Sequence, residues 1–129
     1  MMAYNNIGLQ AYKEQTVNTM TSGEMLILLY DEIIKRLKKA EILAKNSDFE
    51  NFESEVKRAQ EIVAYLTNSL DRKFEISKNL SSLYNFFNYQ LIRVTASRNL
   101  ALIDEIIPLI EDLRDTYKQA DKLSKMQTG

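Results

Sequence analysis

The apolar residues of the chain recur at steps of three and four positions, the spacing of one face of an α-helix. The pattern is densest in residues 21–31, TSGEMLILLYD, where a helix start signal and an apolar run coincide. Thr21 can act as the N-cap, and Glu24 can complete a capping box with it. The pattern therefore predicts a long helix from about Ser22 to Lys45, ending before a turn-forming Asn-Ser-Asp sequence.

This first predicted helix has two adjacent apolar lines, more than one buried stripe requires. The line assigned to the protein's own core consists of Leu26, Leu29, Ile33, Leu37, Ala40 and Ala44. The second line, formed by Ile27, Tyr30 and Ile34, remains available for a partner.

Three more helices follow from the same periodicity. Asp48 is predicted to cap the second, which ends near residues 71–73, and the third extends over residues 75–98. The fourth covers residues 99–125 with an asparagine as its cap. Pro108 lies inside this last pattern, and because its ring removes one backbone hydrogen bond, we expect a bend about one turn earlier rather than an end.

The short connections between these helices leave room only for antiparallel neighbours. The chain has 129 residues, with 45% apolar residues, one proline and three glycines, which suits long helices and one domain. We therefore expect an all-α protein, an up-down-up-down four-helix bundle over residues 21–126. Residues 1–20 are expected to form an N-terminal arm or short helix, since Gly8 weakens any longer one.

The residue types that most bundle enzymes require are missing. The chain has no histidine and no cysteine, which excludes Glu-x-x-His di-iron sites, phosphorylated histidines and thiol nucleophiles. Its carboxylates fall on polar helix faces, where Asp31 with Lys35 and Glu32 with Arg36 are expected to form ion pairs. We expect no enzyme activity, no cofactor and no metal site.

Charge and hydropathy indicate which partners and which cellular compartment to expect. A net charge of -1 offers no basic surface for nucleic acid or for an anionic membrane. The basic run at residues 35–39 has acidic neighbours and is interpreted as a solvated face. No apolar run approaches the ~20 residues that a membrane-spanning helix needs, and no signal sequence is evident at the N-terminus. The cytoplasm is the expected compartment, without membrane insertion.

An aromatic cluster on the third predicted helix indicates an exposed apolar surface. Tyr84, Phe86, Phe87 and Tyr89 point around more than half of the helix circumference. Phe87 is assigned to the core, and at least one or two of the other rings must then lie outside it. Exposed apolar patches of this kind usually bind a partner.

Several sequence blocks resemble a known family. They are the segment 21–31, the Leu-Asp pair at 70–71, ISKNLSSLY at 76–84 and LRDTYK at 113–118, together with arm residues at positions 9, 11 and 12. Their order and spacing are similar to those of the flagellar secretion chaperones specific for flagellin.

The resemblance implies a cytoplasmic chaperone that binds the disordered C-terminal segment of flagellin, prevents premature polymerisation and delivers the subunit to the flagellar type III export apparatus. It also implies an autoinhibitory arm that covers part of the binding groove, with Leu9, Ala11 and Tyr12 as its matching residues. For the groove we predict apolar contacts from Ile27, Tyr30, Ile34, Leu80, Tyr84 and Phe86, and hydrogen bonds to the guest backbone from Asn79 and Asn85.

A second hypothesis is that the spare apolar lines close a helical homo-oligomer with a structural or adaptor role. The sequence leaves open whether the protein is a monomer or a weak homodimer. It also leaves open whether an export gate component or an anti-sigma factor shares the surface.

Overall fold

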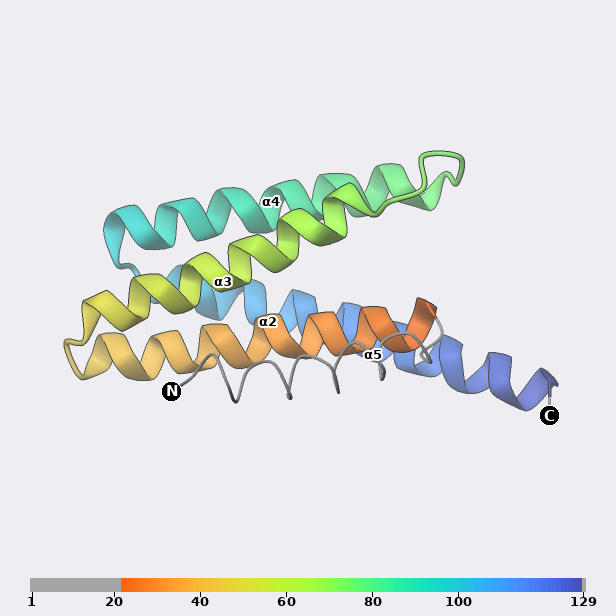
Figure 1. The fold of residues 1–129 in the computed structure, drawn as a ribbon, viewed down its shortest axis with the longest axis horizontal. Helices are drawn as coiled ribbons and strands as arrows, with labels where there is room; N and C mark the ends of the chain where they lie inside the picture. The colour runs from red at the N-terminus through yellow and green to blue at the C-terminus, as the bar shows by residue number, and fades with distance from the viewer. Residues whose placement is uncertain (1–21, 129) are drawn as a thin grey trace, which may run out of the picture.

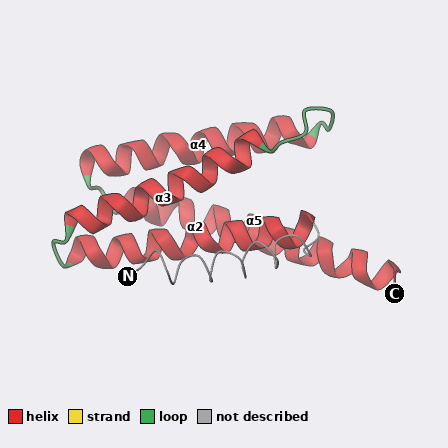
Figure 2. Cartoon of the chain, viewed as in Figure 1, coloured by secondary structure: helices red, strands yellow, loops and turns green. Residues whose placement is uncertain are grey.

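The computed structural model describes residues 22–128, which form four α-helices with no strand among them (Figures 1 and 2). The helices are α2 (Ser22–Lys45), α3 (Phe49–Asn68), α4 (Ile76–Ser97) and α5 (Ala101–Thr128). Successive helices run in opposite directions (Figure 1). The predicted antiparallel four-helix bundle is confirmed.

Each helix packs against two others. α2 contacts α3 and α5, and α4 contacts the same two helices from the other side. α2 and α4 therefore occupy opposite corners of the bundle. This arrangement explains why the apolar face of each helix is wide, since it has to cover two neighbours rather than one.

Local hydrogen bonds set several helix ends where the sequence places them. The Asp48 carboxylate accepts a hydrogen bond from the backbone N–H of Asn51 at 3.3 Å and caps α3, as predicted. The Asn99 side chain accepts one from the backbone N–H of Ala101 at 3.1 Å at the start of α5. α5 continues through Pro108, as expected. The predicted Thr21 cap lies outside the described residues.

The α3–α4 connection differs from the prediction. α3 ends at Asn68, a few residues early, and the hydroxyl of Ser77 donates a hydrogen bond to the backbone carbonyl of Asp71 at 2.5 Å. Ser77 is buried, whereas the neighbouring Ile76 is 59% exposed. In the first turn of α4, Ser77 therefore faces the α3–α4 connection and Ile76 faces outward.

All four helices contribute to one apolar core. Its buried side chains are Tyr30, Ile33, Ile34, Leu37, Ala40, Phe52, Val56, Ala59, Val63, Leu66, Leu80, Tyr84, Phe87, Leu91, Val94, Leu102, Ile103, Ile106, Ile107 and Ile110. On α2 they include Ile33, Leu37 and Ala40 from the line assigned to the core.

Two tyrosines link the opposite corners of the bundle through this core. The hydroxyl groups of Tyr30 on α2 and Tyr84 on α4 are hydrogen-bonded at 2.5 Å. The ring of Tyr117 on α5 lies 5.9 Å from that of Tyr30, centroid to centroid. Burial raises the pKa of both Tyr30 and Tyr84, because ionisation would place a charge in the apolar core. The pair satisfies two polar groups that would otherwise be buried without partners.

Alkaline pH is expected to weaken the fold through this pair. An unfolded tyrosine loses its proton near pH 10, whereas the folded-state pKa of Tyr30 lies above that value. Stability is therefore intact below about pH 10 and falls as pH rises further, by up to about 1.4 kcal/mol per pH unit for each such tyrosine. Urea unfolding below and above this pH measures the slope. The double variant Tyr30→Phe/Tyr84→Phe should show a flatter dependence, and an unchanged slope would contradict the assignment.

Candidate partner-binding surface

The structure places four of the predicted guest-binding residues in the core. Tyr30, Ile34 and Tyr84 are fully or almost fully enclosed, and Leu80 is only 9% exposed. The prediction that Tyr30 and Ile34 belong to a spare apolar line is wrong, and Leu80 and Tyr84, predicted as groove contacts, also belong to the core. The reason is that α2 contacts both α3 and α5, so both of its apolar lines are needed for packing.

The other four predicted residues do not form one groove. Asn79 and Asn85 are exposed on α4, and Phe86 on the same helix is 40% exposed. Ile27 is half-buried and lines a shallow hollow with residues of α5, among them Met126. Since α2 and α4 lie at opposite corners, Ile27 is separated from the α4 residues. The predicted arm residues Leu9, Ala11 and Tyr12 lie outside the described residues, and their role stays a prediction.

The outer side of α4 is a surface of aromatic, aliphatic and amide side chains, which we call the α4 face: Asn79, Asn85, Phe86, Tyr89 and Ile92. Tyr89 and Ile92 are 60% and 53% exposed. This confirms that some rings of the aromatic cluster lie outside the core, while Phe87 lies inside it.

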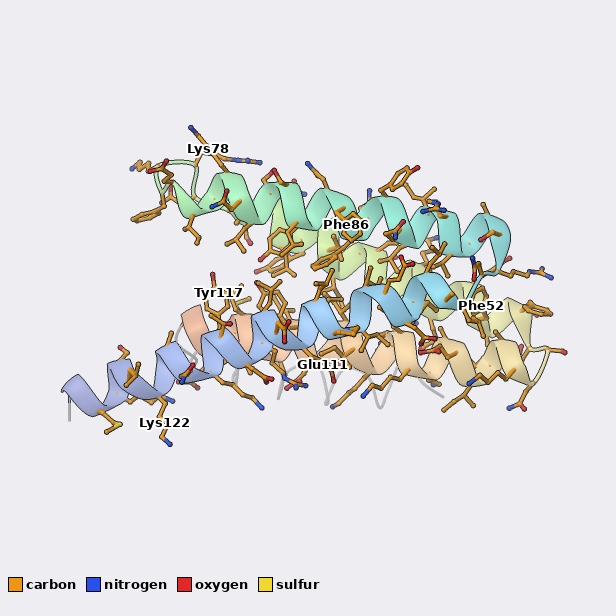
Figure 3. The ribbon with its side chains drawn as sticks, turned by 180° about the vertical axis from the view of Figure 1, so that it is seen from behind. Phe52, Lys78, Phe86, Glu111, Tyr117 and Lys122 are labelled. Atoms are coloured by element: carbon orange, nitrogen blue, oxygen red, sulfur yellow. The ribbon has the colours of Figure 1, made fainter. Side chains whose placement is uncertain are left out.

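Charge is scarce along the α4 face. In the whole of α4 only Lys78 and Arg93 are charged, and the Arg93 guanidinium lies 5.7 Å from the centre of the Tyr89 ring. Lys78 lies at the N-terminal end of α4 and Phe86 further along the helix (Figure 3). Enrichment in aromatic residues with depletion of charge is the composition of a protein interface.

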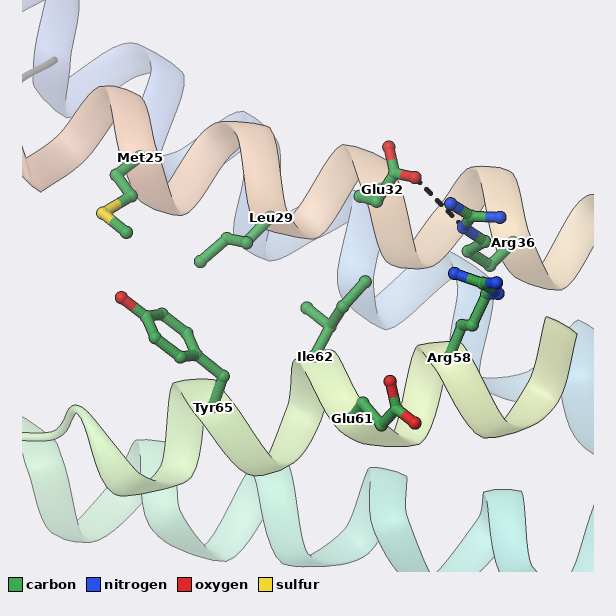
Figure 4. A pocket seen from close by; sticks show the side chains of 8 residues that line it. All are labelled: Met25, Leu29, Glu32, Arg36, Arg58, Glu61, Ile62 and Tyr65. Atoms are coloured by element: carbon green, nitrogen blue, oxygen red, sulfur yellow. Dashed lines mark hydrogen bonds and ion pairs between the residues drawn. The ribbon is translucent and has the colours of Figure 1, made fainter. Parts of the chain in front are cut away.

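A second apolar surface lies between α2 and α3, and we call it the α2/α3 groove (Figure 4). Its volume is about 420 Å³. Its apolar part is formed by Met25 and Leu29 of α2 with Ile62 and Tyr65 of α3. Its polar part is formed by Glu32, Arg36, Arg58 and Glu61.

The sequence pattern missed this groove. Leu29 was assigned to the core and is half-buried, and Tyr65 falls between the apolar lines of α3 and is 49% exposed. A signal existed in the three-residue step from Ile62 to Tyr65, which sets both on one flank of the helix. That flank becomes recognisable only once α2 is known to lie beside it.

Ion pairs join the side chains in the polar part of the groove. Arg36 donates to Glu32 at 3.0 Å, the predicted pair, and also to both carboxylate oxygens of Glu55 at 2.9 and 3.2 Å. The hydrogen bond with the Glu55 carboxylate raises the pKa of Arg36. Asp31, expected to pair with Lys35, instead accepts a hydrogen bond from Arg114 of α5 at 3.0 Å. The contact across the bundle replaces the one along the helix.

Among the described residues, no group of three or more carboxylates is arranged to hold a metal ion. No helix in the described range is long and apolar enough to cross a membrane. Within residues 22–128, the α4 face and the α2/α3 groove are thus distinguished by their apolar and aromatic side chains, and the groove also by its charged border.

The family model described as "Flagellar protein FliS" matches residues 4–124 of the chain. The flagellar secretion chaperone FliS of Bacillus subtilis (strain 168) is 29% identical over 110 residues, covering 85% of this chain and 83% of that protein. The protein of the same name from Campylobacter jejuni is 26% identical over 117 residues, covering 89% and 91%. A crystal structure of a flagellar chaperone from bacteria superposes with a TM-score of 0.77 at 21% identity, covering 89% of this chain and 98% of that one.

Proposed function

The chain belongs to the family of the flagellar protein FliS, the flagellar secretion chaperones, and we propose that its guest is the disordered C-terminal segment of flagellin. In this proposal the protein binds newly made flagellin in the cytoplasm, keeps it from polymerising early and delivers it to the flagellar type III export apparatus. It acts by binding alone and catalyses no reaction.

The observation that carries the proposal is the pair of unfilled apolar surfaces on a bundle whose core is already complete. The α2/α3 groove has an apolar floor and a charged border, the features that accept an amphipathic helix. The α4 face adds Tyr89 and Ile92, which are mostly exposed, and Phe86, whose ring is 40% exposed and lies 6.3 Å from the core ring of Phe87. The two surfaces lie on different sides of the bundle, so a single guest helix cannot cover both.

A disordered segment suits this layout better than a folded partner does. Such a segment can wrap a large surface and fold locally at each apolar patch, because it orders only on binding. Its apolar side chains are then covered by the chaperone and unavailable for contact with other flagellin subunits. This is the physical basis we propose for preventing early polymerisation.

Calorimetric titration tests the proposal. The guest is a peptide of the last roughly 40 residues of flagellin from the same organism, long enough as a helix to pass along the bundle more than once. We expect saturable binding with a negative heat-capacity change and a gain in helical circular dichroism, the signs of coupled folding and binding. A peptide of the same composition in scrambled order is the control.

Two outcomes would contradict the proposal. One is the absence of heat and of added helicity with a folded chaperone. The other is a stable homodimer in light scattering that ignores the peptide, which would favour the helical assembly with a structural or adaptor role.

A further inference from the structure

The α2/α3 groove continues into a second hollow of different character. Both hollows are lined by Arg36 and Arg58, so they form one channel between the two helices. The second hollow is completed by Lys39, Leu43, Asn51, Ser54 and Glu55. The channel therefore has an apolar end near Met25 and Tyr65 and a polar end further towards the C-terminus of α2.

The polar end carries an excess of positive charge. Arg36, Lys39 and Arg58 line it with one carboxylate, that of Glu55, which is 5% exposed. Glu55 already binds Arg36 at 2.9 Å and lies 3.8 Å from the Lys39 ammonium group. Two further carboxylates, Glu32 and Glu61, line the apolar end, where Glu32 pairs with Arg36.

Among these three cations, Arg58 does not take part in the ion pairs described above. Its guanidinium extends from α3 towards that of Arg36 on α2 (Figure 4). Within residues 23–126, no ion pair joins Arg58 to a carboxylate. Two guanidinium groups that approach from facing helices repel each other unless an anion joins them, so this end of the channel favours an anionic occupant.

We propose that the channel sets the direction of the guest helix: its apolar side lies on Met25, Leu29, Ile62 and Tyr65, and its C-terminal α-carboxylate lies over Arg58 and Lys39. The guest helix then runs parallel to α2 and antiparallel to α3. This inference rests on the proposed function, since it takes the C-terminal segment of flagellin as the occupant.

The electrostatics of a C-terminal helix favour this direction whatever its sequence. The last turn of an α-helix carries the negative end of the helix dipole, and the free α-carboxylate adds a full negative charge beside it. The opposite direction would bring the positive end of the dipole to Arg58 and Lys39. The distance fits too, because the 14 residues from Met25 to Lys39 extend about 21 Å along α2, room for a guest helix of about 14 residues.

Two peptides and two chaperone variants test the anchoring of the carboxylate. The peptides are the C-terminal flagellin segment with a free carboxylate and the same segment with a C-terminal amide. We expect amidation to weaken binding to the native chaperone by about threefold to fivefold at low salt. In Arg58→Gln this difference should shrink to less than about twofold. Lys57→Gln, which removes an exposed charge from the same helix outside the channel, should behave as the native protein does.

A spin label tests the direction itself. The native chain has no cysteine, so Ser54→Cys, in the lining of the second hollow, and Asn68→Cys, at the C-terminal end of α3, each give a single attachment site. A label at position 54 should broaden the NMR signals of the last guest residues, and a label at position 68 those of residues about three to four helical turns earlier.

Each result decides a separate claim. Equal affinities of the two peptides would overturn the anchoring of the carboxylate, and the reverse broadening pattern would overturn the direction; both would leave the chaperone function in place. Failure of both peptides to bind a folded chaperone would overturn the proposed function together with the direction. Circular dichroism of each variant shows whether it is folded.

Discussion

The double variant Tyr65→Asp/Phe86→Asp is expected to keep its fold but to bind the flagellin segment at least about 100-fold more weakly than the native protein does. Tyr65 lines the α2/α3 groove and Phe86 belongs to the α4 face. Loss of a large aromatic anchor commonly costs an interface 2 kcal/mol or more, about 30-fold, and the new carboxylate would have to be buried against the guest. Both side chains are exposed in the free protein, at 49% and 40%, so little core packing is lost.

Ile42→Asp is the matched control for this experiment. Ile42 is 60% exposed on the outer side of α2, yet it belongs neither to the groove nor to the α4 face. The same change of an exposed apolar residue to aspartate should therefore leave guest affinity within about twofold of the native value. If Ile42→Asp weakened binding as much as the double variant does, general exposure of apolar surface, rather than these two surfaces, would explain the binding.

Two adjacent phenylalanines on α4 should separate stability from binding. Phe87→Ala is expected to reduce the free energy of unfolding by about 3–5 kcal/mol, because it leaves a cavity in the core. Phe86→Ala should cost less than about 1 kcal/mol, since that ring is partly exposed, but should weaken guest binding. Urea unfolding measures the first effect and peptide titration the second.

Both changes remove a phenylalanine ring from the same helix, so the two variants differ only in where that ring lies. If the two variants lost equal stability, the assignment of Phe86 to the surface would be wrong. If Phe86→Ala bound the guest as the native protein does, the α4 face would play no part in recognition.

The helices could be predicted from the sequence because local signals set them. Three- and four-residue steps give the extent of α2, and short polar side chains mark the starts of α3 and α5 at Asp48 and Asn99. These signals depend on contacts within a few residues. The all-α fold follows from them, because four such helices with short connections have few other ways to bury their apolar faces.

The binding surface was harder to predict because it depends on which helices are neighbours. Tyr30 and Ile34 resemble a spare line in the sequence, but both are buried in the core, where Tyr30 contacts Tyr84 of α4 and Tyr117 of α5. In the sequence Tyr65 is an isolated ring, and in the structure Met25 lies across the groove from it. Periodicity gives the width of an apolar face but not how many neighbours that face has to cover.

Hydrogen exchange of the complex with the flagellin segment tests the central claim most directly, since it reports on both partners. Amides of the guest are expected to gain protection as it folds. Protection in the chaperone is also expected to increase along residues 25–36, 58–65 and 79–92, which carry the groove and the α4 face. A bound guest whose amides exchange as fast as those of the free peptide would contradict the account, and so would protection confined to other parts of the bundle.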